Sequence, residues 1–126
     1  MSTPAEPRHL ELTVFGSFRA SHSLTGFEVP HYHLWKVEAE FSADWPLSSD
    51  RLIDLLFLQS TLDRIFFAVE GTHLNSVLSV SPTSENLTAW IWKRLTEELP
   101  DAPLSRVAVS LCDLSGKVSG RARLSR

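Results

Sequence analysis

The sequence of 126 residues contains a single cysteine, Cys112, so no disulfide can form within the chain. We therefore expect a reducing, intracellular setting. No apolar run approaches the roughly 18 residues that cross a membrane. Residues 1–7 are polar, whereas a signal peptide has a basic start followed by an apolar stretch. Repeats and low-complexity tracts are missing as well. These absences predict a cytoplasmic protein that makes no contact with a membrane.

Excess charge of either sign is also missing. The formal net charge is −3 and the isoelectric point is near 5.9, so nothing electrostatic favours binding to nucleic acid or to anionic lipid. Hydrophobic residues make up 43% of the chain, which is typical of a globular protein. The length predicts a single domain over residues 9–126, preceded by a flexible lead-in over residues 1–8.

Hydrophobic periodicity predicts four strands and two helices. Residues 33–41 alternate strictly, with the odd-numbered residues on one face, as in a half-buried strand. Residues 10–20 predict a first strand, kinked at Gly16, and residues 107–111 and 117–124 predict the last two. Apolar steps of three and four predict helices over residues 54–69 and 82–99, the second with Ser81 as its N-cap and Pro82 as its first residue. The expected class is α+β in the order β-β-α-α-β-β.

Three of the five histidines form a pattern. His31 and His33 are two apart at the entry to a predicted strand, so their side chains project from the same face. If the first two strands pair antiparallel, the connection over residues 23–30 brings His22 beside them. Three neutral imidazoles suit Zn²⁺ and leave a fourth position open for water or substrate. The alternative interpretation is a set of unrelated surface or hydrogen-bonded histidines.

Around these histidines the sequence resembles the 6-pyruvoyl-tetrahydropterin synthase and 6-carboxytetrahydropterin synthase family. Residues 18–24 (FRASHSL) are similar to the family's F-x-A-x-H-x-L, and residues 31–33 (HYH) stand where the family has H-G-H. Residues 74–75 (LN) and 82–86 (PTSEN) match its L-N and P-T-[SA]-E-N segments, and the resemblance runs from about residue 15 to residue 111.

The resemblance implies the tunnelling fold, in which an antiparallel four-stranded sheet carries two helices on one face. It implies that zinc is bound by His22, His31 and His33. It also implies a homo-oligomer, a trimer or a hexamer, with active sites for a small-molecule substrate at the subunit boundaries.

Part of the family's active site is changed in this chain. The positions of the family's catalytic cysteine fall on Thr25 and Phe27, and its Asp-His pair falls on Glu70 and Gly71. The glutamate that anchors the pterin ring falls on Leu111, which cannot pair with the N–H groups of a pterin. The metal-binding half of the site is therefore kept, whereas the pterin-recognition half is not.

Other residues are candidates for the missing roles. Glu28 lies three residues before His31, similar to the E-x-x-H-G-H of a subgroup in which glutamate replaces the cysteine, and is our candidate general base. The alternative for Glu28 is a solvated loop residue. His73, together with Glu70, is the candidate replacement for the family's catalytic pair. The candidate substrate contacts are Tyr32, Thr83, Glu85 and Asp113.

The predicted function is that of a zinc-dependent lyase or cyclase, acting by elimination, retro-aldol cleavage or ring closure. One alternative keeps the zinc and replaces the pterin chemistry by a carbonyl condensation that joins an amine to an aldehyde in a specialised biosynthetic pathway. A second alternative is a catalytically inactive, zinc-stabilised oligomeric binding protein. The basic residues near the C-terminus are expected to form a solvated edge strand, with contact to a phosphate-bearing substrate as the alternative.

Overall fold

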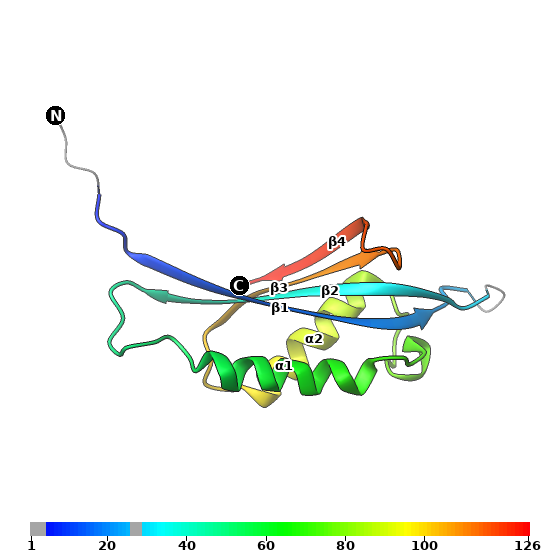
Figure 1. Cartoon of the computed structure of the whole chain (residues 1–126), viewed down its shortest axis with the longest axis horizontal. Coiled ribbons are helices and arrows are strands. Elements are labelled where there is room, and N and C mark those ends of the chain that lie inside the picture. The colour runs from blue at the N-terminus through cyan, green and yellow to red at the C-terminus, as the bar shows by residue number, and fades with distance from the viewer. Residues whose placement is uncertain (1–4, 26–28) are drawn as a thin grey trace.

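The computed structural model describes residues 5–25 and 29–126, arranged as a sheet layer and a helix layer (Figure 1). The elements are β1 (His9–His22), β2 (His31–Asp44), α1 (Leu55–Val69), the 3-10 turn η1 (Leu74–Ser76), α2 (Ser84–Glu98), β3 (Leu104–Cys112) and β4 (Val118–Ser125). The strands form one antiparallel sheet in the order β1-β2-β3-β4, and both helices cover the same face. The predicted α+β class and element order are confirmed. None of the helices among the described residues is long and apolar enough to cross a membrane.

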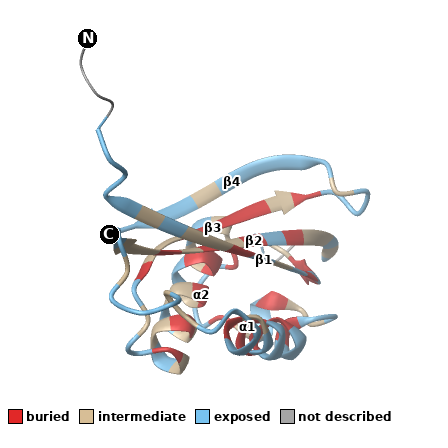
Figure 2. Cartoon of the chain, turned by 60° about the vertical axis from the view of Figure 1, so that its left-hand side comes forward, coloured by how far each residue is buried: buried red, intermediate tan, exposed pale blue. Residues whose placement is uncertain are grey.

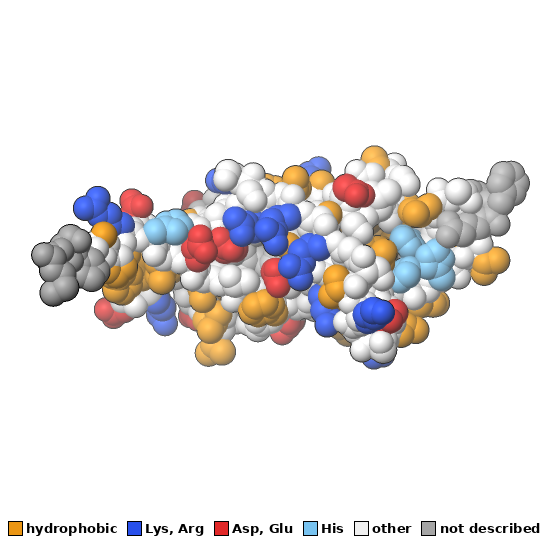
Figure 3. Space-filling model, turned by 90° about the horizontal axis from the view of Figure 1, so that it is seen from above, with side chains coloured by type: hydrophobic (Ala, Val, Ile, Leu, Met, Phe, Trp, Pro, Cys, Tyr) orange, Lys and Arg blue, Asp and Glu red, His pale blue; other side chains and the backbone are white. Residues whose placement is uncertain are grey.

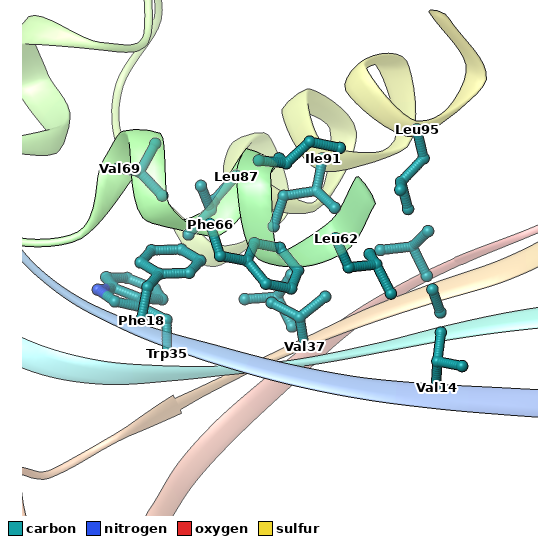
Figure 4. Packing of buried hydrophobic residues seen from close by; sticks show 14 of the residues in the cluster. Val14, Phe18, Trp35, Val37, Leu62, Phe66, Val69, Leu87, Ile91 and Leu95 are labelled. Carbon is teal, nitrogen blue, oxygen red and sulfur yellow. The ribbon is translucent and has the colours of Figure 1, made fainter. Parts of the chain in front are cut away.

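The core lies between the sheet and the helices. In β2 the predicted alternation holds, since Trp35, Val37 and Phe41 are at most 2% exposed whereas Lys36 is exposed. The helix-facing side of β1 adds Phe18, and the apolar stripes of α1 and α2 close the core from the other side (Figure 4). Full burial of each large apolar side chain contributes about 1.5–3 kcal/mol.

Side-chain caps decide where the helices begin. The carboxylate of Asp54 accepts hydrogen bonds from two backbone N–H groups in the first turn of α1. In α2 the cap is Thr83, whose hydroxyl accepts the N–H of Asn86 at 3.1 Å. The predicted start with Ser81 as N-cap and Pro82 as the first residue is therefore wrong by two residues. The reason is that Thr83 caps the helix, while the carbonyl of Ser81 accepts the side-chain amide of Asn86.

Gly16 lies in β1 beneath the ring of Phe66 from α1. The pairing of β1 with β2 continues through this residue, so the predicted kink is not present. A Cβ atom at Gly16 would overlap the buried ring of Phe66 from α1. Glycine is needed here for close packing of the helix on the strand.

We expect Gly16→Ala to lower the free energy of unfolding by about 1–3 kcal/mol, because the ring of Phe66 must move within a packed core. Urea denaturation of the parent and the variant measures this difference. Gly120→Ala in β4 is the control, since a Cβ atom there meets no atom within 4 Å. Equal effects of the two substitutions would contradict the packing argument.

β4 is the outer strand of the sheet on one side and β1 on the other. Nearly the whole of β4 is exposed, with only Ala122 partly buried (Figure 2). This agrees with the predicted solvated edge strand. At one end of the sheet, β1 ends opposite the start of β2, and this end carries the histidines.

Candidate metal centre

Three histidines converge where β1 ends and β2 begins. The strand register places His22 directly opposite His31, and His33 lies on the same face of β2. Their ring centroids are 4.6–4.9 Å apart, and one ligand nitrogen from each ring lies within 4.8 Å of the other two. His22 is only 4% exposed, and the other two rings are partly buried. The structure thus brings together all three histidines that the sequence singled out.

A backbone carbonyl lies beside the Nδ1 atom of each ring. The distances are 2.9 Å from His22 to Pro82, 3.2 Å from His33 to Cys112 and 3.4 Å from His31 to Val29. A carbonyl oxygen can only accept, so these contacts favour the tautomer with the proton on Nδ1, in which the neutral ring presents the lone pair of Nε2. Outer contacts of this kind orient histidines that bind metals.

The Nε2 atoms of His22 and His31 face each other at 3.1 Å. When both rings carry the proton on Nδ1, their Nε2 lone pairs point toward each other and can bind one cation. Two nitrogens bound to one tetrahedral zinc at about 2.0–2.1 Å lie roughly 3.4 Å apart. The observed spacing therefore fits two ligands of one zinc ion.

His33 is held in the form that a metal requires. Burial lowers the pKa of His33 below its usual value, although its hydrogen bond to the carbonyl of Cys112 opposes this shift. The neighbouring rings of His22 and His31 lower the pKa further. The neutral imidazole keeps its lone pair for a cation.

Two asparagine side chains fix the backbone segments that hold His22 in place. Asn75 in η1 both donates to the carbonyl of Ser23 and accepts its N–H, at 2.8 and 3.0 Å, which fixes the chain just after His22. Asn86 donates to the carbonyl just before Pro82 at 2.9 Å and so holds the turn whose next carbonyl contacts His22. The L-N and P-T-S-E-N motifs thus have a structural role that sequence reasoning missed. The motifs themselves could have indicated this role, but the sequence does not show which backbone carbonyl faces His22.

The candidate pair near the end of α1 lies differently. His73 bridges to Ser21, with its Nδ1 atom 2.9 Å from the hydroxyl oxygen. Neighbouring residues of a strand project to opposite faces, so His73 lies on the face opposite to His22. The carboxylate of Glu70 accepts the backbone N–H of Arg19 at 2.7 Å. The structure therefore does not bring either residue to the histidines of the same chain.

Asp113 holds the turn between β3 and β4. Its carboxylate accepts hydrogen bonds from the hydroxyl of Ser115 and from the backbone N–H groups of Ser115 and Lys117. These hydrogen bonds lower the pKa of Asp113, the Ser115 hydroxyl most of all. The carboxylate is thus already engaged by its own turn.

The remaining candidates lie on different elements, and Tyr32, between His31 and His33 in β2, projects from the face opposite to theirs. Thr83 caps α2, one residue beyond the Pro82 carbonyl that contacts His22. Tyr32 is 55% exposed, and Glu85 is exposed in the first turn of α2. Glu28 lies outside the described residues.

Comparisons with known proteins agree with this architecture. The sequence model of the 6-pyruvoyl tetrahydropterin synthase family matches residues 11–115. A dihydroneopterin monophosphate aldolase from Pyrococcus furiosus is 27% identical over 94 residues, covering 74% of this chain and 82% of that protein.

Solved structures share the fold at lower identity. The 6-pyruvoyl tetrahydropterin synthase of Caenorhabditis elegans superposes with a TM-score of 0.75 at 14% identity, over 98% of this chain and 99% of that one. A Plasmodium vivax 6-pyruvoyltetrahydropterin synthase in which a catalytic glutamate is replaced by alanine gives 0.69 at 15% identity, over 94% and 98%. The tunnelling fold implied by the sequence motifs is confirmed, and the chain belongs to the 6-pyruvoyl tetrahydropterin synthase family.

Proposed function

We propose that this chain is a zinc-dependent lyase that acts on a small hydroxyl- or carbonyl-bearing substrate of the pterin type. The observation that carries the proposal is the convergence of His22, His31 and His33, each with Nδ1 beside a backbone carbonyl. Among the residues the structure describes, no other His, Cys, Asp or Glu joins this cluster. A zinc site with three protein ligands and an open position is typical of catalytic rather than structural zinc.

A zinc ion bound there supplies a Lewis acid that polarises a hydroxyl or carbonyl oxygen of the substrate. The chain itself must then accept and return a proton, and we assign this role to Glu28. Glu28 stands three residues before His31 in the sequence, which supports this assignment. The catalytic glutamate named for the Plasmodium vivax enzyme supports a carboxylate in this role.

The relative from Pyrococcus furiosus favours an aldolase-type reaction. In such a step Glu28 takes the proton of a side-chain hydroxyl. The bond then breaks between the carbon that bears this hydroxyl and the neighbouring carbon that stays attached to the ring. The electron pair passes into the ring, which takes up a proton at the carbon that remains. A small aldehyde leaves. Elimination and ring closure use the same proton acceptor, and they stay within the proposal.

We propose His73, with Glu70, as the second candidate for proton transfer. Because His73 lies on the face opposite to His22, we prefer Glu28 as the general base that acts within one chain. We further propose a homo-oligomer, a trimer or hexamer, with its sites at the subunit boundaries. The outer edge of β4 can pair with a strand of another chain, and so can β1 before Arg19, which supports this arrangement. The end of β1 is already paired with residues 71–73.

One observation favours a second function. Leu111 lies opposite Trp35 and packs partly buried against the core, where the family resemblance implies the carboxylate that anchors a pterin. A leucine leaves the N–H groups of a pterin without a partner. A non-pterin carbonyl condensation between an amine and an aldehyde, on the same zinc site, is therefore the alternative. An inactive zinc-stabilised binding protein is the third possibility.

The test is to load the chain with zinc and supply dihydroneopterin monophosphate or its dephosphorylated form. We expect release of a small aldehyde from at least one of them, detected by derivatisation and mass spectrometry, and none from zinc-free protein. Binding without turnover would favour the inactive binding protein. If the protein neither binds nor turns over these compounds, a pterin-type substrate is ruled out and the amine–aldehyde reaction is favoured.

A further inference from the structure

A row of polar residues crosses the sheet on the face away from the helices. The strand register pairs Ser17 with Lys36, Lys36 with Ser110, and Ser110 with Arg121. The row therefore spans all four strands, with two hydroxyl side chains alternating with two cations. The three histidines project from the opposite face of the sheet, so this row is separate from the candidate metal centre.

The row forms the floor of a cavity of about 530 Å³. Phe15, Glu38 and Val118 complete its wall together with the polar row. Seen from this side, Lys and Arg side chains run along the middle of the molecule (Figure 3). The cavity is thus a concave, cation-lined part of the open sheet face.

The two cations are held in place without being neutralised. The ammonium group of Lys36 donates to the carbonyl of Gly116 at 3.1 Å, and Nε of Arg121 donates to the hydroxyl of Ser110 at 2.8 Å. Within residues 5–25 and 29–126, neither cation has a carboxylate within 4.0 Å, whereas Arg64, for example, contacts Glu98 at 2.7 Å.

The remaining donors suit a phosphate group. Lys36 keeps further N–H groups, and the two terminal nitrogens of Arg121 can bind two oxygens of one phosphate side by side. Ser17 adds a hydroxyl at the other end of the row. In the two neighbouring rows, Arg19 and Arg123 add positive charge, against the single carboxylate of Glu38.

The wall of the cavity points to more than inorganic phosphate. Phe15 is 62% exposed and offers an aromatic surface at the cavity, and Glu38 can accept an N–H or O–H group. We propose that this row, named here the Lys36–Arg121 row, binds the phosphate group of a small phosphate monoester whose organic part lies toward Phe15. This inference is independent of the proposed lyase activity.

Isothermal titration of the full chain with phenyl phosphate and with inorganic phosphate tests this inference. We expect phenyl phosphate to bind more tightly, because its ring contacts Phe15. Lys36→Gln and Arg121→Gln should each weaken binding about tenfold or more, since each removes a charge-assisted hydrogen bond. Lys36→Arg should keep most of the affinity. Lys93→Gln, on α2 across the sheet, is the matched control and should bind as the parent does.

Several results would overturn the inference. Failure of the parent chain to bind either probe is one such result, and binding by the two glutamine variants as tight as that of Lys93→Gln is another. Loss of binding in His31→Ala would place the phosphate at the metal centre instead of the Lys36–Arg121 row. Equal affinity for the two probes would overturn the contact with Phe15. Circular dichroism of each variant confirms that a loss of binding is not a loss of the fold.

Discussion

His31→Ala is expected to weaken zinc binding by at least about 100-fold, because even outer contacts of a metal ligand are worth 10–100-fold in affinity. The variant removes one of three converging imidazoles and leaves two, which cannot hold the ion in a stable tetrahedral site. His31 is the right position to change because it is only partly buried. His22 is 4% exposed and contacts the carbonyl of Pro82, so its loss would also disturb the fold.

Metal content after dialysis, measured by mass spectrometry, gives the answer directly. A second measurement is the melting temperature, because zinc that binds only the folded chain stabilises it by about 2.7 kcal/mol at 100 times the dissociation constant. The parent should gain this stability on addition of zinc, and His31→Ala should not. His9→Ala is the matched control, since His9 lies at the far end of β1, opposite Asp44. Equal zinc content in His31→Ala and the parent would contradict the proposed metal centre.

Glu28→Gln is expected to lower kcat by about 100- to 10,000-fold while zinc content stays unchanged. The amide has nearly the shape of the carboxylate but cannot accept a proton at neutral pH. The measurement is the rate of aldehyde release by zinc-loaded protein from the pterin-type substrate that the parent cleaves. Retained zinc in the variant shows that the effect belongs to proton transfer.

Glu97→Gln on α2 is the control for this experiment, because Glu97 is an exposed residue that contacts Lys93 and Arg94 on the helix surface. It should leave kcat unchanged. His73→Asn separates the two candidate bases. A large loss of rate in His73→Asn together with normal turnover in Glu28→Gln would transfer the role to His73.

Much of the fold follows from local patterns. The strict alternation in residues 33–41 places Trp35 and Val37 in the core, and the three- and four-residue steps of residues 54–69 define α1. The start of α2 was predicted two residues early because both Ser81 and Thr83 are good N-caps. Only the hydrogen bonds of Asn86 decide between them, and these depend on how the preceding turn is folded.

The sequence by itself determined that His31 and His33 share one face of a strand, because side chains alternate along any extended chain. The family motifs also placed His22 in the same site. Tertiary structure alone decided the pairing of His22 with His31 and the backbone carbonyls that lie beside the rings. It also decided the position of His73 on the opposite face and the alignment of Lys36 with Arg121 in one row. The physical reason is that periodicity is a property of neighbouring residues. Strand register and the direction of a backbone carbonyl depend instead on segments far apart in the chain.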